Sequence, residues 1–403
     1  MNNVRILFSL SLALLIGCAL NALAQTKSGA KRASAGVKTT SQSSGAFDVA
    51  VKTGDEARIA NRLDEAIEAY TNAVRIQPKW PDGWWYLGAI FYEKDLYPQA
   101  RDAFSNLVAL EPKRGPAWAM LGLCQFQTRE YEQAVNSLQR GYTLGINSNK
   151  ELDTVVRYHA ALLYIRFEQF EMAFDVLKEL QPDNPRVVEA FGLIILRMPF
   201  LPNEIPADRR EELLLAGQAG ASMAARRTEV ARRAFDGLLV KYPDDSNVHY
   251  SFGVFIMPQD ADLAVKEFRR ALDINPQHQP AMVQLAFEYL KRREYETALP
   301  FAEKSVELVP TMYPARNVLG RVLIELGQTA RAVDELEAGV RLAPESPEMH
   351  FALARAYARA GRKQEANREN ETFKKLQEKY NRQSEAAQTD GAPSANTAKP
   401  DPK

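Results

Sequence analysis

The sequence predicts an all-α fold: an α-solenoid of about nine helix hairpins, with one interruption and a polar C-terminal capping helix. Three observations predict it. Apolar residues recur at helical spacing in short segments that end at proline or glycine. One order of large and small residues returns about every 34 residues. The residues outside this pattern are confined to the two ends of the chain and one internal insertion.

The segment 84–112 shows the pattern most completely. Two short amphipathic helices explain its order of residues, since small side chains allow the two backbones to pack closely. The positions that define the pattern are Trp84, Leu87, Gly88 and Phe91, then Ala100, Phe104 and Leu107, and the helix stop Pro112.

Glycine returns at one place in the pattern, before the turn of the hairpin. A glycine inside a helix costs about 1 kcal/mol relative to alanine, so we expect close helix packing to offset that cost. A side chain at these positions should push the paired helices apart. The positions are Gly88, Gly122, Gly253 and Gly320.

The recurrences divide the chain into a predicted solenoid at 47–383 and flanking segments. We expect a signal peptide at 1–24, and a disordered linker at 25–46 and tail at 384–403, because both are rich in small polar residues. The last helix turns polar after Asn367, as a solenoid end that faces water must. The predicted repeats are 47–80, 81–114, 115–148, 154–187, 212–245, 246–278, 279–312, 313–346 and 347–380, with an insertion at 188–211.

The insertion begins with helical residues near Val187 but lacks the second helix of a hairpin. Three prolines between 198 and 206 break any helix there. Its apolar residues Phe200, Leu201 and Ile205 either dock a partner or fold back over the solenoid, and we favour folding back.

The repeated residues resemble the tetratricopeptide repeat (TPR) family over most of the chain. The resemblance implies a right-handed solenoid that binds a protein or peptide on a concave face lined by the first helix of each repeat. Packing against neighbouring helices is an equal alternative for each residue of that face. The implied partner-binding residues are Trp85, Tyr92, Phe126, Tyr158, Leu162, Tyr250, Met257, Phe287, Asn317, Arg321, Arg355 and Arg359.

This predicted lining is apolar and aromatic over most of its length and basic towards its C-terminal end. An extended or helical peptide with apolar anchors and an acidic end would suit it. The Lys/Asn clamp of chaperone-binding TPR proteins is not visible in any repeat pair, which disfavours chaperone tails as ligands.

The N-terminus resembles an export signal of the bacterial type. Arg5 precedes an apolar run at 6–20, and Ala22-Leu23-Ala24 offers a cleavage site before Gln25. A competing interpretation is a lipobox at 15–18, in which Cys18 carries the lipid, although the residues after Cys18 stay apolar. We therefore expect a periplasmic or secreted protein, or a membrane-anchored lipoprotein whose only membrane contact is the lipid.

No motif for catalysis, metal or cofactor binding is present in the sequence. The motifs HExxH, GxxxxGK[ST], CxxC and GxSxG are missing, and the four histidines lie in different repeats. Cys124 lies between apolar residues and is expected to be a buried small hydrophobe. The net charge of zero lacks the electrostatic footprint of a nucleic-acid-binding protein.

The sequence thus predicts a non-catalytic protein–protein interaction scaffold of the bacterial cell envelope, without cofactor and without nucleic acid. The alternative is an accessory subunit or lipoprotein that presents substrates to an envelope enzyme or assembly machine. An enzyme is disfavoured, because no segment remains for a catalytic domain. The partner and the oligomeric state are left open.

Overall fold

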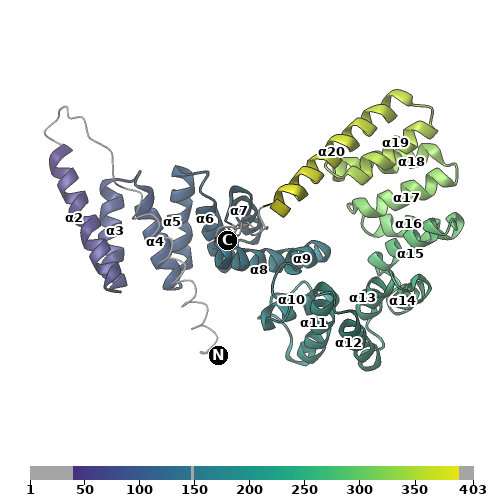
Figure 1. Ribbon diagram of the computed structural model, residues 1–403, viewed down its shortest axis with the longest axis horizontal. Helices are drawn as coiled ribbons and strands as arrows, with labels where there is room; N and C mark the ends of the chain where they lie inside the picture. Colours follow the sequence, from purple (N-terminus) through teal and green to yellow (C-terminus); the bar gives the residue numbers. More distant parts are fainter. Residues whose placement is uncertain (1–39, 147–148, 390–403) are drawn as a thin grey trace, which may run out of the picture. The chain divides into compact units, whose positions relative to one another are not determined.

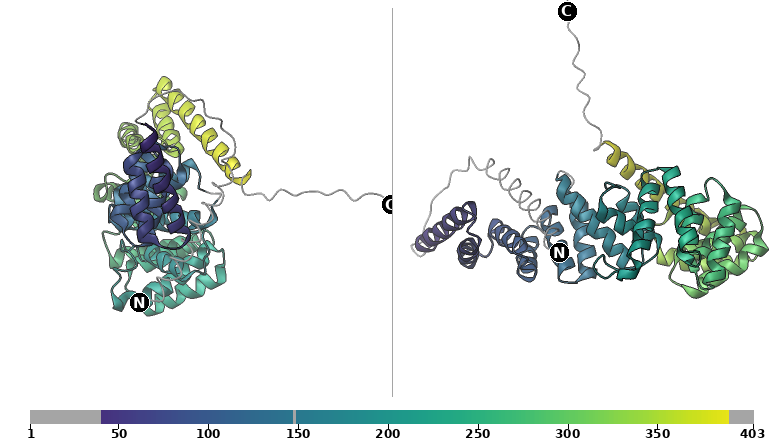
Figure 2. Two further views of the ribbon diagram at one scale, coloured as in Figure 1. Left: turned by 90° about the vertical axis from the view of Figure 1, so that its left-hand side faces the viewer. Right: turned by 90° about the horizontal axis from the view of Figure 1, so that it is seen from below.

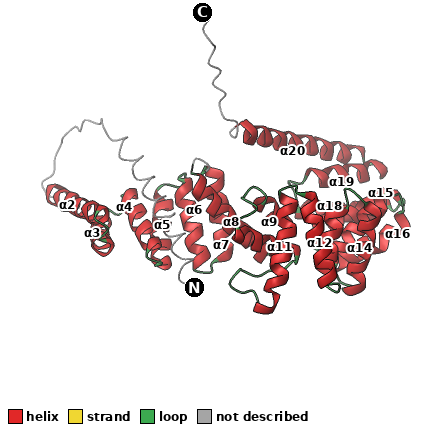
Figure 3. Ribbon diagram, turned by 60° about the horizontal axis from the view of Figure 1, so that its bottom comes forward, coloured by secondary structure: helices red, strands yellow, loops and turns green. Residues whose placement is uncertain are grey.

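A computed structural model describes residues 40–146 and 149–389, which form helices, turns and loops and contain no strand (Figures 1 and 3). The predicted all-α solenoid fold is confirmed. The predicted signal peptide, including Cys18, and residues 390–403 lie outside the described ranges. None of the helices in the described ranges has the length and apolar character needed to span a bilayer.

The chain divides into two compact units, Met1–Ala234 and Phe235–Lys403. In the first unit, consecutive helices pair as hairpins, and the hairpins lie side by side (Figures 1 and 2). Its helices are α2 (Thr40–Ile59), α3 (Leu63–Ile76), α4 (Pro81–Glu93), α5 (Tyr97–Leu110), α6 (Gly115–Gln127), α7 (Tyr131–Leu144), α8 (Lys150–Arg166), α9 (Phe170–Leu177), α10 (Pro185–Ile195), the 3-10 helix η1 (Ala207–Arg209) and α11 (Arg210–Ala224).

The second unit repeats the same pairing of helices. In α14, for example, the buried residues Ala264, Phe268 and Ala271 follow helical spacing and face the partner helix α13. The division between the units falls within α12 (Thr228–Lys241). The helices of the second unit are α13 (Ser246–Ile256), α14 (Ala261–Ile274), α15 (Gln279–Lys291), α16 (Tyr295–Leu308), α17 (Tyr313–Glu325), α18 (Thr329–Leu342), α19 (Pro347–Arg359) and α20 (Lys363–Thr389).

The recurrent glycines lie where the two helices of a hairpin approach most closely. A methyl group added at Gly88 would lie 2.8 Å from Cζ of Phe104, and one at Gly253 would lie 2.6 Å from Cε1 of Phe268. Carbon atoms in contact stay about 3.5–4.0 Å apart. The glycine of the first helix therefore makes room for the large residue of the second helix, as the sequence predicts.

Most hairpin turns close in the same way; the α13–α14 turn differs, because it contains no residue with positive φ. The backbone N–H of Leu96 donates to the carbonyl of Phe91 over 2.8 Å, and Asp95 between them has a positive φ of 58°. This is the Schellman arrangement that ends helices and satisfies their last carbonyls. Gly361 has a φ of 75° at the equivalent turn of the last hairpin.

The predicted insertion contains one extra first-type helix, α10. It ends in the same turn as the other first helices, because the Met198 N–H donates to the Leu193 carbonyl over 2.9 Å. The following loop then packs against α8, where Arg166 bonds the Pro199 carbonyl over 3.1 Å and the Glu204 carboxylate over 3.0 Å. Leu201 is buried. These contacts favour the interpretation that the loop folds back over the solenoid.

The helices extend into both flanking segments that we expected to be disordered. Helix α2 begins at Thr40, within the predicted linker 25–46, and α20 continues to Thr389, within the predicted tail 384–403. Near the start of α2, the Phe47 ring packs edge-on against Trp80, with centroids 5.2 Å apart. A polar segment joined to a packed amphipathic helix can extend that helix, which composition alone does not reveal.

Candidate partner-binding surfaces

The first helices of the repeats carry the predicted partner-binding residues, and some of these residues are buried. Trp85, Leu162 and Tyr250 are only 6%, 3% and 7% exposed. The Trp85 ring packs edge-on against Phe104, with centroids 5.7 Å apart, while the Arg114 guanidinium lies over its face at 4.6 Å. Burial favours the packing alternative for these three positions.

Half-buried rings remain on the first helices α6 and α8 of the first unit, and one ring of the second helix α7 lies beside them. The Phe126 ring centroid lies 5.9 Å from that of Tyr131 and 4.8 Å from that of His159, which in turn lies 5.5 Å from Tyr158. We call these four residues the ring cluster; helices α6, α7 and α8 contribute them. Tyr92 on α4 is also half-buried and packs against the same apolar core as Phe126.

The ring cluster is electrically neutral near pH 7. Burial lowers the pKa of His159 to about 4, against a smaller opposing effect of the Val155 carbonyl, to which Nδ1 donates over 2.8 Å. Burial also raises the pKa of the Tyr158 hydroxyl to about 12. Neutral, partly exposed rings offer contact area for an apolar side chain of a partner.

The second unit combines a ring with cations on its first helices. The Lys291 ammonium lies over the Phe287 ring at 5.7 Å from its centroid, and the Arg321 guanidinium lies over it at 5.6 Å. We call these three residues the cationic stack. Helix α15 supplies the ring and the lysine, and α17 supplies the arginine.

The charges around the cationic stack are paired, with one exception. Lys291 bonds Glu288 over 2.9 Å, and Arg355 bonds Glu325 over 2.8 Å. Arg321 makes no hydrogen bond or ion pair with any residue of the described ranges. Burial lowers the pKa of the Arg321 guanidinium, and the nearby positive charge of Arg355 adds to this effect against the opposing influence of Glu325.

The remaining predicted residues of the second unit differ in their surroundings. The Asn317 side chain donates to the Glu348 carbonyl over 3.3 Å, so it contributes to the contact between α17 and α19. Met257 is half-buried, and Arg359 is exposed. The structure therefore places Arg321 over Phe287 and near the charge of Arg355, but it engages Asn317 in packing.

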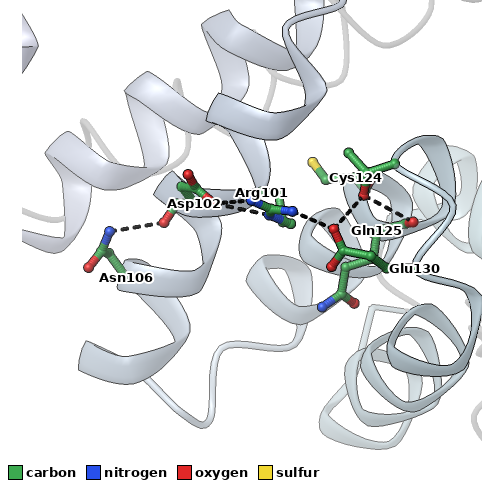
Figure 4. Close-up of polar contacts among 7 residues, drawn as sticks. Arg101, Asp102, Asn106, Cys124, Gln125 and Glu130 are labelled. Carbon is green, nitrogen blue, oxygen red and sulfur yellow. Dashed lines mark hydrogen bonds and ion pairs between the residues drawn. The ribbon is translucent and has the colours of Figure 1, made fainter.

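A contrasting arginine lies on α5 of the first unit and bonds a residue of the turn between α6 and α7. Arg101 bonds the carboxylate of Asp102 over 2.7 Å and also bonds Glu130, as Figure 4 shows. Thr128 donates to the same Glu130 carboxylate over 3.0 Å. Unlike Arg321, Arg101 has its guanidinium satisfied by carboxylates of its own unit.

Histidines and the cysteine have structural partners. His249 bonds Glu267 and the Pro243 carbonyl, and His350 bonds Glu369 and the Pro344 carbonyl. Cys124 is buried, as predicted, and burial raises its thiol pKa. Among the described residues, no three side chains of the metal-binding types His, Cys, Asp and Glu lie close enough to share an ion.

Sequence reasoning missed Lys291 and Glu325, although each had a local signal. Lys291 follows Phe287 by four residues, and Glu325 follows Arg321 by four, so each pair shares a helix face. Reading these i,i+4 neighbours would have added both residues to the predicted surface.

Comparison with known families identifies tetratricopeptide repeats in the chain. The TPR repeat model matches residues 54–95, and the tetratricopeptide repeat model matches 92–149. The model of the middle TPR-like domain of cilia and flagella-associated protein 70 matches residues 213–377. The chain therefore contains TPR repeats in both units, in agreement with the helix hairpins of the structure.

Individual proteins are similar to parts of the chain. Anaphase-promoting complex subunit 3 of Schizosaccharomyces pombe is 29% identical over 118 residues, which are 29% of this chain and 18% of that protein. A MamA structure labelled AMB-1 is 24% identical, with a TM-score of 0.35, and covers 39% of this chain and 94% of its own. MamA from Desulfovibrio magneticus RS-1 is 22% identical, with a TM-score of 0.38, and covers 41% and 94%.

Proposed function

We propose that this protein is a non-catalytic scaffold that binds a protein or peptide partner on the surface formed by the first helices of its repeats. The observation that carries the proposal is the presence of half-buried rings and an uncompensated cation on those helices. The ring cluster provides apolar contact area in the first unit, and the cationic stack adds positive charge in the second. Recognition surfaces commonly combine aromatic anchors with arginine in this way.

The proposal also holds that the protein has no catalytic activity. Each histidine of the described ranges bonds a carbonyl, carboxylate or amide of its surroundings, which accounts for it by structure alone. Detectable hydrolase or transferase activity of the purified chain would contradict this part of the proposal.

Site-specific photo-crosslinking in the native host tests the partner-binding surface. A p-benzoyl-phenylalanine placed at Phe126 or Phe287 should form a covalent adduct with a partner protein. Matched positions on second helices are Tyr142, which is 41% exposed, and Leu342, which is 43% exposed. Adducts that form equally well from all four positions, or from the second helices alone, would contradict binding on the first-helix surface.

We further propose that the protein is exported to a bacterial cell envelope. The support is the sequence of its N-terminal segment, with Arg5, the apolar run and the cleavage site before Gln25. Intact mass and cell fractionation test this. A soluble mature chain that starts at Gln25 indicates a periplasmic or secreted scaffold, and a lipid-modified Cys18 in the membrane fraction indicates a lipoprotein. An unprocessed chain in the cytoplasm would refute export.

A further inference from the structure

Arg321 is the one member of the cationic stack whose charge no carboxylate of its own compensates in the described part of the chain. Glu288 pairs with Lys291, and Glu325 pairs with Arg355. The remaining contact of Arg321 is with the face of Phe287. A cation–π contact uses the charge of the guanidinium but none of its five N–H donors, so these donors remain free for a ligand.

The free protein carries a cost at this position that a ligand would relieve. A half-buried guanidinium loses part of its hydration, and Arg355 nearby repels it, as the lowered pKa of Arg321 indicates. An anion placed against the guanidinium restores hydrogen bonds and cancels the repulsion. Arg316 on the same helix has no such cost, because it bonds Glu335 and the Pro310 carbonyl.

We propose that Arg321, held against Phe287, binds a side-chain carboxylate of an acidic peptide segment in the partner protein. This inference rests on the proposed function and names the chemistry that the second unit recognises. The guanidinium fork matches a carboxylate in two parallel hydrogen bonds. The Phe287 ring beside it accepts an apolar side chain of the same peptide, so an aspartate or glutamate next to an apolar residue is the preferred ligand.

A nucleic acid fits this surface less well than an acidic peptide. Nucleic-acid surfaces present a stripe of unpaired cations, whereas here Lys291 and Arg355 are each paired with a glutamate. The whole chain has a net charge of zero. One uncompensated arginine beside a ring is suited to one carboxylate.

The experiment selects peptides from a random phage-displayed library on the immobilised full chain and measures a selected peptide by fluorescence anisotropy. We expect acidic residues beside apolar ones, and binding weakened about tenfold or more by Arg321→Gln. Changing the peptide's acidic residue to its amide should weaken binding similarly, and the two changes together should cost little more than either alone. Arg321→Lys keeps the charge but loses the fork, so its affinity for the peptide should lie between those of the wild type and Arg321→Gln.

The matched control is Arg331→Gln. Arg331 is an exposed arginine on the second helix α18 and bonds Glu303 over 2.7 Å, so its replacement should leave binding unchanged. Peptides that require Phe287 but bind Arg321→Gln as tightly as the wild type would overturn the carboxylate inference and leave the scaffold proposal intact. A selection that yields no binding peptide would also overturn this inference, while crosslinking from Phe126 independently judges the scaffold proposal.

Discussion

The two units share one type of hydrogen bond between successive repeats, but different kinds of side chain form it. In each case, a side chain in the first turns of a first helix donates a hydrogen bond to the carbonyl of a proline six residues earlier. Neutral indoles do this in the first unit, and ionisable side chains do it in the second. The pairs are Trp84–Pro78 (2.8 Å) and Trp118–Pro112 (3.0 Å) in the first unit, and His249–Pro243, Arg316–Pro310 and His350–Pro344 (2.9 Å each) in the second.

The difference matters because an indole keeps its proton at every relevant pH and an imidazole does not. His249 lies between two acceptors, since Nε2 faces the Pro243 carbonyl and Nδ1 lies 2.6 Å from the Glu267 carboxylate. Only the doubly protonated ring donates to both. Burial lowers the pKa of His249, but the bonds to Glu267 and Pro243 outweigh burial, and the net effect raises it. The second unit is therefore expected to sense pH through a contact that is insensitive in the first.

The sequence supplies a separate probe for each side of this comparison. All four tryptophans lie between residues 80 and 118, within the first unit. Tryptophan fluorescence therefore reports unfolding of the first unit alone, whereas circular dichroism at 222 nm reports helices of both units. Differences between the two signals belong to the second unit.

The largest expected effect comes from a feature that the units share. Gly122→Leu in the first unit and Gly253→Leu in the second should each lower the free energy of unfolding by roughly 3 kcal/mol, at any pH. Added methyl groups would lie 2.8 Å from the Leu138 side chain and 2.6 Å from the Phe268 ring. Urea unfolding measures both variants, and only Gly122→Leu should shift the tryptophan signal.

Gly237→Ala in α12 is the matched control. An added methyl group there has no neighbour within 4 Å, so the change should stabilise the helix by about 1 kcal/mol. Stabilisation by the substitutions at both Gly237 and Gly253 would show that helix propensity, not close packing, decides the effect.

The second prediction tests the pH difference directly. Because the pKa of His249 is raised in the folded state, its stabilising contribution is fully present below the unfolded pKa of about 6.5 and is lost as the pH rises through the folded pKa. The urea midpoint of circular dichroism should therefore fall over that range. The midpoint of tryptophan fluorescence should stay constant.

Glu267→Gln provides the control for this pH dependence. Two charged groups face His249. The Glu267 carboxylate favours the protonated imidazole, and the positive charge of Arg270 opposes protonation. Neutralising Glu267 should lower the pKa of His249 and flatten the decline of the circular dichroism midpoint. A decline that persists unchanged in His249→Gln would assign the pH dependence to another group.

The third prediction contrasts a paired and an unpaired arginine. Arg101→Met in the first unit removes the partner of two carboxylates and should destabilise the protein by about 1 kcal/mol. Arg321→Met in the second unit removes an uncompensated half-buried charge and should stabilise it by about 0.5–1 kcal/mol. A loss of stability in both variants would mean that Arg321 is held for packing and not for a ligand. Thermal unfolding followed by circular dichroism measures both.

Local sequence pattern was sufficient for the hairpins. Gly253 and Phe268 could be paired from their places in the repeat, because the spacing of small and large residues encodes the contact between two successive helices. The extra helix α10 could also be expected near Val187. Its ending in a regular turn at Met198, followed by a loop bonded to Arg166, depends on a contact between distant residues that no local pattern encodes.

The candidate surface was predicted less completely, because its side chains can pack against either of two neighbouring helices. Trp85 occupies a first-helix position that was assigned to partner binding, but its ring packs against Phe104. The pairing of Arg355 with Glu325 joins residues of successive repeats and leaves Arg321 without a carboxylate. Side-chain geometry decides which of the two arginines forms an ion pair with Glu325, and the sequence does not reveal that geometry.

The last prediction concerns the hairpin turns, where the residue with positive φ is a glycine in some repeats and not in others; in the second unit, Arg293 has a φ of 63°. Positive φ is adopted by non-glycine residues such as Arg129 (64°) in the first unit, whereas the last turns of the second use Gly327 and Gly361 (74° and 75°). Gly361→Ala should cost about 1 kcal/mol, because the left-handed region disfavours a Cβ atom.

Arg129→Gly is the reverse change and should have the smallest effect of all. Relief of left-handed strain is offset by about 0.4–1 kcal/mol of added entropy in the unfolded chain, so the net change should stay within about 0.5 kcal/mol. Tryptophan fluorescence during urea unfolding measures it, since Arg129 belongs to the first unit. A stabilisation well above 1 kcal/mol would mean that Arg129 imposes backbone strain on its turn. The turns that use Gly327 and Gly361 avoid such strain.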